Sequence, residues 1–70
     1  MNRIPVVNSS NIASAGYDPE TQTMEVEFTN GNVYQYFDVP QAVHEELMKA
    51  ESAGTFLNAQ VKGVYRYTRL

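Results

Sequence analysis

Residues 23–37 contain two runs in which hydrophobic and polar residues alternate, on either side of a turn. In the first run, Met24, Val26 and Phe28 are separated by glutamates, which is the period of two expected for a strand with one buried face. The turn is Asn-Gly, a pair that tolerates positive φ. The pattern therefore predicts a β-hairpin, on which the rest of the chain must pack.

The length of the hairpin loop decides which face carries Tyr34 and Tyr36. In a two-residue loop, both rings lie beside the glutamates on the exposed face. In a three-residue loop that begins at Thr29, with a left-handed glycine in a bulge, the two rings face Val26 and Met24 instead. We favour the bulged loop, because each ring then buries its body beside an apolar neighbour and leaves its hydroxyl at the rim.

A weaker strand is predicted before the hairpin, over residues 12–17. Gly16 within it indicates either a bulge or a close approach of another backbone. A turn over residues 18–21, with proline at its second position, leads into the hairpin. The three strands form an antiparallel meander. Residues 1–9 are expected to be a lightly ordered lead-in, because Pro5 restricts this apolar run to a sheet edge or an extended segment.

Residues 40–51 are predicted to form a helix that covers one face of the meander. Val43, Leu47 and Ala50 recur at i, i+4 and i+7 and therefore share one helix face. The proline that opens this segment suits the first helical position, because its missing N–H would have no partner there. Gly54 is expected to end the helix in a left-handed conformation.

A second, shorter helix is predicted over residues 55–62, with Thr55 as its cap and Gly63 as its end. Residues 64–70 form either an extended tail or a short fourth strand. The expected fold class is α+β, a three-stranded antiparallel β-meander with two helices on one face in the order β-β-β-α-α, as a single domain over residues 10–70. The expected core comprises Met24, Val26, Phe28, Val43, Leu47, Phe56, Leu57 and Val61.

The composition excludes several classes of protein. The 70 residues make one small domain, and a chain of this size buries only about 60% of the surface that its unfolded form exposes. There is no cysteine, and therefore no disulfide and no thiolate metal site. No stretch approaches the roughly 20 apolar residues of a membrane span. Because the first residues also lack the apolar run of a signal peptide, we expect a cytoplasmic protein.

Charge is unevenly distributed along the chain. Residues 1–51 hold all eight acidic residues and two of the five basic ones, which gives this part a net charge of −6. The other basic residues, Lys62, Arg66 and Arg69, give the remainder a net charge of +3. An acidic body therefore carries a basic C-terminal end.

No residue pattern supports catalysis, a cofactor or a metal. His44 is the only histidine, and we expect it on the solvated face of the first helix. One histidine does not make a metal site, and a general base also needs an orienting partner and a pocket. Glu25 and Glu27 are expected to be solvated residues on the exposed face of a strand. We therefore expect a domain that is not an enzyme.

Basic and aromatic residues interleave near the C-terminus, which offers charge for phosphates and flat rings for the bases of single-stranded RNA. The alternative interpretation is structural, with Tyr65 packed under the second helix and the arginines neutralising the acidic body. The candidate RNA-binding residues are Lys62, Tyr65, Arg66, Tyr67 and Arg69, joined by Tyr34 and Tyr36 only if the hairpin has the two-residue loop. Binding would be weak and salt-sensitive, and three neutralised phosphates would give a slope of log K against log salt of about −2.

An alternative function uses the other face of the sheet. In the bulged hairpin, Val33 and Phe37 point away from the helices, so apolar surface remains on the open face. Such surface often marks a contact site. This feature predicts a protein partner or weak self-association.

The residues also resemble the KTSC domain family. The resemblance extends over about residues 10–70, and its most specific part is Tyr34-x-Tyr36 followed by Val39-Pro40. The other matching residues are Gly16-Tyr17-Asp18, Val26-x-Phe28, Gly31, Ala50-x-Ser52-x-Gly54, Phe56-x-Asn58, Val61 and Tyr65-x-Tyr67. The resemblance implies a small bacterial domain that occurs alone or at the C-terminus of some lysyl-tRNA synthetases. It implies no established activity, and the attachment to a synthetase favours RNA as a partner.

Overall fold

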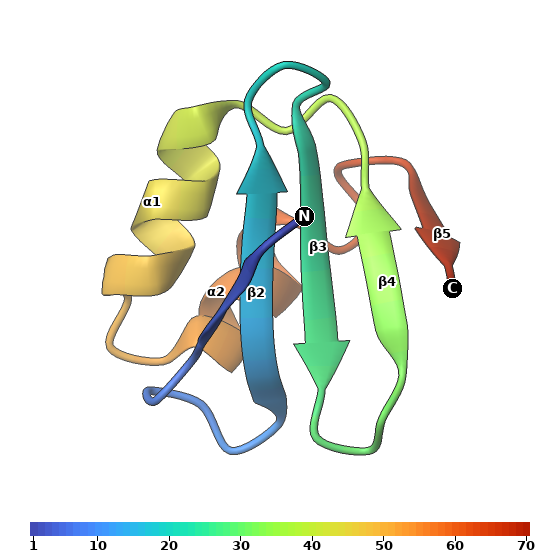
Figure 1. Cartoon of the computed structure of the whole chain (residues 1–70). Coiled ribbons are helices and arrows are strands. Elements are labelled where there is room, and N and C mark those ends of the chain that lie inside the picture. Colours follow the sequence, from blue (N-terminus) through green and yellow to red (C-terminus); the bar gives the residue numbers. More distant parts are fainter.

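The sheet contains five strands in sequence order, and each strand pairs antiparallel with its neighbours. The computed structural model describes residues 1–70. The strands are β1 (Arg3–Pro5), β2 (Ile12–Asp18), β3 (Thr23–Phe28), β4 (Val33–Tyr36) and β5 (Tyr67–Arg69), and the helices are α1 (Gln41–Lys49) and α2 (Ala53–Gln60). Both helices lie on the same side of the sheet (Figure 1). The α+β class is confirmed, but the sheet has five strands rather than three because β1 and β5 extend its two edges.

The hairpin of β3 and β4 has the three-residue loop. Gly31 has a φ of +92°, and its N–H donates to the carbonyl oxygen of Phe28 at 2.9 Å. Val26 pairs with Tyr34. The favoured register is therefore confirmed, and Tyr34 and Tyr36 lie on the face that also carries the helices.

The edge strand β1 lies close against β2. A Cβ atom on Gly16 would lie 2.6 Å from the main-chain oxygen of Asn2. Gly16 therefore marks a close backbone approach, whereas the irregularity in the pairing of β2 lies between Ile12 and Ser14. Val6, which follows β1, is buried in the core.

The junction between the two helices differs from the sequence prediction. Helix α1 ends at Lys49, and Gly54 lies in the first turn of α2 instead of ending α1. The prediction that Thr55 caps α2 is also wrong, because Ser52 is the N-cap and its hydroxyl accepts a hydrogen bond from the N–H of Thr55 at 3.3 Å. Pro40 is the N-cap of α1 rather than its first helical residue, so the helix begins one residue later than predicted.

The core lies between the sheet and the two helices. Of the residues expected there, Met24, Val26, Leu47, Leu57 and Val61 are buried, and Phe28, Val43 and Phe56 are half-buried against them. Tyr36 is buried, as the bulged register predicts, but the hydrophobic pattern missed Val6, Ile12, Ala15, Val39 and Ala53. These residues lie in short or weakly periodic segments, so their burial depends on how the elements pack.

Candidate functional site

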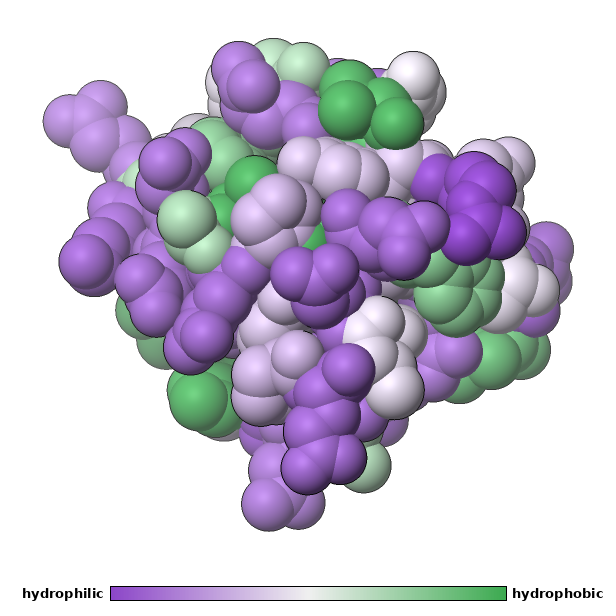
Figure 2. Space-filling view, turned by 90° about the horizontal axis from the view of Figure 1, so that it is seen from above, coloured by the Kyte–Doolittle hydropathy of each residue, from purple (hydrophilic) through white to green (hydrophobic).

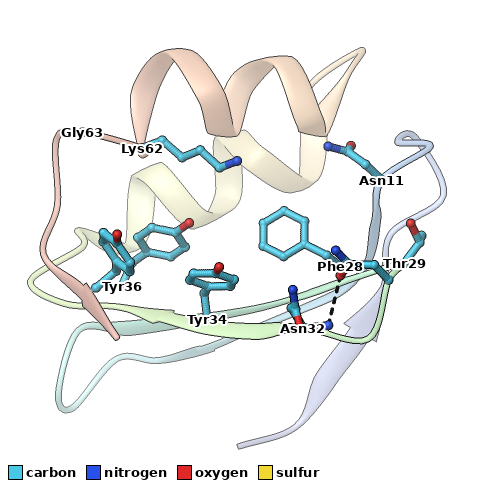
Figure 3. A pocket seen from close by; sticks show the side chains of 10 residues that line it. Asn11, Phe28, Thr29, Asn32, Tyr34, Tyr36, Lys62 and Gly63 are labelled. Carbon is cyan, nitrogen blue, oxygen red and sulfur yellow. Dashed lines mark hydrogen bonds between the residues drawn. The ribbon is translucent and has the colours of Figure 1, made fainter. Parts of the chain in front are cut away.

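A groove of about 680 Å³ opens between the sheet and the C-terminal end of α2. Its size falls in the range of roughly 300–1,000 Å³ that is usual for ligand pockets. The lining residues are Asn11, Phe28, Thr29, Asn30, Asn32, Tyr34, Tyr36, Lys62, Gly63 and Tyr67. Figure 3 shows the rings of Phe28, Tyr34 and Tyr36 above the sheet, with the side chain of Lys62 reaching across from the end of α2.

Aromatic rings form one wall of the groove. Tyr34 and Tyr36 share a face of β4, and the pairing of β4 with β5 places Tyr67 opposite Tyr36. The ring centroid of Tyr67 lies 5.7 Å from that of Tyr34 and 6.0 Å from that of Tyr36. Phe28 lies 5.6 Å from Tyr34 in a perpendicular arrangement. Because Tyr36 is 2% exposed and Tyr67 is 61% exposed, the wall runs from a buried base to a ring that a ligand can reach.

The groove is positively charged, unlike the chain as a whole. Lys62 is its only ionised lining residue, and the Nζ atom lies 5.3 Å from the ring centroid of Phe28. Burial, together with the neighbouring tyrosines, raises the pKa of the Tyr36 phenol above its usual 10.0, so this group stays neutral near neutral pH. None of the eight acidic residues lines the groove.

The fold brings together four of the candidate RNA-binding residues, namely Lys62, Tyr67, Tyr34 and Tyr36. Arg69 pairs with Tyr34 across β4 and β5 and therefore projects from the same face of the sheet. The two tyrosines of β4 line the groove in the bulged register, although the sequence linked them to the site only through the two-residue loop. The reason is that the helices lie behind β2 and β3 and leave much of β4 and β5 uncovered (Figure 1).

Arg66 and Tyr65 lie apart from the groove. The guanidinium of Arg66 stands 5.7 Å from the ring centroid of Phe37, and its Nη2 lies 2.9 Å from a carboxylate oxygen of Asp38. Tyr65 is half-buried and packs against the core. Both residues therefore make the contacts that the structural interpretation of this segment expects.

Sequence reasoning missed Phe28, Asn11 and Asn32 as groove residues. Phe28 follows the same alternation as Met24 and Val26, which indicates burial but cannot show that the last ring of the strand meets the groove. The two asparagines lie in turn segments without a motif. Only the pairing of distant segments places them around one opening.

The open face of the sheet carries the residues predicted to contact a protein. Val33 lies opposite Glu27, Phe37 lies beneath Arg66, and both hydrophobic residues are half-buried. The carboxylates of this face have partners within the chain, in the contacts Arg3–Glu25 at 3.4 Å, Gln35–Glu25 at 3.0 Å and Ser14–Glu27 at 2.9 Å. Polar groups with partners therefore interrupt the apolar surface.

The expectation that His44 is solvated is wrong. Its ring stacks on that of Tyr17 with a centroid distance of 5.2 Å, and its Nδ1 atom is buried without a hydrogen-bond partner. His44 precedes the buried Leu47 by three residues, a spacing that places both side chains on one helix face. Burial lowers the pKa of His44 below its usual 6.5, while Glu45 opposes the shift. No group of three or more His, Asp or Glu residues is arranged to hold a metal ion.

The end of the molecule that carries the turn between β2 and β3 is largely hydrophilic, and its hydrophobic areas are small and separate (Figure 2). No helix has the length and apolar character needed to cross a membrane. A second, shallower hollow is lined by Phe37, Tyr65 and Arg66, but there the guanidinium pairs with Asp38, whereas the groove combines exposed rings with a cation that has no acidic partner.

Comparison with known proteins supports the resemblance seen in the sequence. The KTSC domain profile matches residues 8–65. A small protein from Tsukamurella paurometabola is 45% identical over 64 residues, which cover 91% of this chain and 96% of that protein. The crystal structure of a KTSC domain protein from Yersinia pestis matches with a TM-score of 0.90 and 38% identity, over 99% of this chain and 96% of that chain.

Longer proteins contain a similar segment. A lysine–tRNA ligase from Nostoc sp. is 44% identical over 54 residues, which cover 77% of this chain but 10% of the ligase. A second lysine–tRNA ligase, from Nostoc punctiforme, is 41% identical over 59 residues, again 10% of that protein. The same domain thus occurs both as a small protein and as a minor part of an enzyme. The chain belongs to the KTSC domain family.

Proposed function

We propose that this KTSC domain is a non-enzymatic module that binds single-stranded RNA in the groove between β4, β5 and the end of α2. The observation that carries the proposal is the meeting of accessible aromatic rings with a cation in an opening without acidic residues. Bases stack on aromatic side chains, and a cation attracts the phosphates. Tyr67 is the most exposed of these rings and is the expected stacking platform.

The relatives favour RNA over other anionic polymers. Segments similar to this chain occur in proteins named lysine–tRNA ligase, and that name includes an RNA. The presence of related segments in these ligases is independent of the geometry of the groove. The net charge of −3 on the chain opposes the binding of RNA. The acidic body repels phosphates at low salt, so we expect weak binding that fades as salt screens the groove.

Binding can be measured by fluorescence anisotropy with short single-stranded RNA at low salt. Stacking contributes about 1–3 kcal/mol per base, so Tyr67→Ala should weaken binding by roughly 5- to 150-fold. Tyr67→Phe keeps the ring and should bind nearly as well as the natural chain. Tyr67→Phe also keeps the contacts of this ring with Tyr34 and Tyr36, so it controls for the packing that Tyr67→Ala removes. Equal affinity of the Tyr67→Ala variant and the natural chain would exclude the groove as the binding site.

The alternative function, a protein contact or self-association through the open sheet face, has weaker support. Phe37 lies under its own chain's Arg66, and the nearby carboxylates have internal partners. Absence of RNA binding at low salt, together with a mass that rises with protein concentration, would favour this alternative.

A further inference from the structure

Three side-chain nitrogen atoms face the same part of the groove. Figure 3 shows the Nζ atom of Lys62 and the amide nitrogen of Asn11 directed toward each other above the ring of Phe28, and the amide nitrogen of Asn32 directed toward them from the sheet. All four residues line the groove. The opening beside Phe28 is therefore rich in hydrogen-bond donors.

Hydrogen bonds within the chain fix the orientation of the Asn11 amide. The hydroxyl oxygen of Ser9 accepts from the main-chain N–H groups of Asn11 at 3.3 Å and Ile12 at 3.2 Å. Its single proton is then donated to Oδ1 of Asn11 at 2.7 Å. This bond uses one of the two lone pairs of the amide oxygen and leaves the NH₂ group, which has no partner within the protein, directed toward the groove (Figure 3). Asn11 therefore directs its side-chain donors toward a ligand in the groove.

Of the two asparagines at the hairpin turn, only Asn32 has a side chain without a hydrogen bond inside the chain. Oδ1 of Asn30 accepts from the N–H of Asn32 at 3.1 Å, so this side-chain oxygen is also occupied. The side-chain amide of Asn32 has no internal partner and can present either its oxygen or its nitrogen. Selection of a ligand by hydrogen bonding therefore depends on Lys62 and Asn11.

We infer that the groove prefers RNA bases with a carbonyl oxygen at position 4 of a pyrimidine or position 6 of a purine, uracil and guanine, to those with an amino group at that position, cytosine and adenine; this inference rests on the proposed function. A carbonyl oxygen accepts from the Lys62 ammonium or the Asn11 amide, whereas an amino group would set donor against donor. An unpaired donor in a partly enclosed site is unfavourable. Lysine also pairs with the carbonyl oxygen of guanine in direct readout of nucleic acids.

The test compares hexauridine with hexacytidine, which have the same charge and similar ring size, by fluorescence anisotropy. One or two additional hydrogen bonds should make hexauridine bind about 3- to 10-fold more tightly. Asn11→Asp replaces the donor with an acceptor and keeps the oxygen that accepts from Ser9, so the preference should disappear or reverse. Ser10→Asp adds the same charge to the neighbouring exposed residue and should keep the preference. If Asn11→Asp fails to fold, Lys62→Met removes the other donor at an exposed position and should also reduce the preference.

The possible outcomes separate this inference from the function on which it rests. Equal affinity for the two RNAs, with binding that still depends on Tyr67, would overturn the base preference and leave RNA binding in place. A preference that is unchanged in both the Asn11→Asp and the Lys62→Met variants would overturn the assignment of these donors. Absence of binding to either RNA at low salt would overturn the proposed function and, with it, the base preference.

Discussion

The dependence of RNA binding on salt should distinguish the basic residues that meet the ligand from those that do not. Each phosphate neutralised on a single strand contributes about −0.7 to the slope of log K against log salt. The sequence alone predicts three contacts, from Lys62, Arg66 and Arg69. In the structure, Lys62 lines the groove and Arg69 projects from the same sheet face, whereas Arg66 stacks on Phe37 away from it. Two contacts predict a slope of about −1.4.

Single substitutions test this division. Lys62→Gln and Arg69→Gln should each flatten the slope to about −0.7, because each removes one phosphate contact. Arg66→Gln is the matched control and should leave the slope unchanged, since its guanidinium already pairs with Asp38 at 2.9 Å. The assay is a titration of hexauridine followed by fluorescence anisotropy, from about 25 to about 200 mM KCl.

Two results would refute this reasoning. A slope near −2 that Arg66→Gln flattens would place Arg66 at the interface and contradict its position away from the groove. A slope that neither Lys62→Gln nor Arg69→Gln changes, with RNA still bound, would show that phosphates do not approach the groove. All three residues are exposed, so the variants should fold and the comparison should report on binding.

Three further predictions concern stability and are checked by urea denaturation. Leu47→Ala should lower the free energy of unfolding by about 2–5 kcal/mol, a large share of the roughly 3–5 kcal/mol that a small core supplies. Glu46→Ala, at an exposed site, is the control and should change it by no more than about 0.5 kcal/mol. A change as small as this for Leu47→Ala would show that Leu47 is not in the core. Because burial lowers the pKa of His44, the unfolded chain binds more protons than the folded chain below about pH 6.5, so the free energy of unfolding should fall as pH drops below that value. His44→Gln should weaken this dependence, and an identical pH profile would contradict the burial of His44. Gly16→Ala would place a Cβ atom 2.6 Å from the main-chain oxygen of Asn2. The displacement of β1 should then lower the free energy of unfolding by about 1–3 kcal/mol. An unchanged midpoint of urea denaturation would refute the close approach of the two backbones.

Local patterns in the sequence determined much of the fold. The alternation of Met24, Val26 and Phe28 with polar residues identified β3, and the glycine after Asn30 limited the hairpin to two registers. The apolar spacing of α1 correctly placed Leu47 in the core. These features could be predicted because each depends on residues that are close in sequence, where backbone geometry sets the period.

The local pattern was insufficient where it permits more than one arrangement. The apolar residues of α1 form only a narrow stripe, and this pattern predicts that His44 lies on the solvated face. The pattern does not show how much of the helix surface beside the stripe is covered by other elements. In the structure, the ring of Tyr17 from β2 stacks on His44 and covers it. Ser52 and Thr55, three residues apart, have the same capping chemistry, so the local sequence permits either as the cap of α2.

The candidate site could be predicted only as separate parts. The tyrosines of β4 and the basic aromatic segment near Tyr67 were both identified in the sequence, but nothing local to either segment specifies that β4 and β5 pair. Their meeting, and the position of Asn11 and Lys62 around Phe28, depend on strand pairing and helix packing between residues far apart in the chain. Residue types and periods are properties of the sequence, whereas a shared surface follows from long-range contacts, whose energies become favourable only when the whole domain is folded.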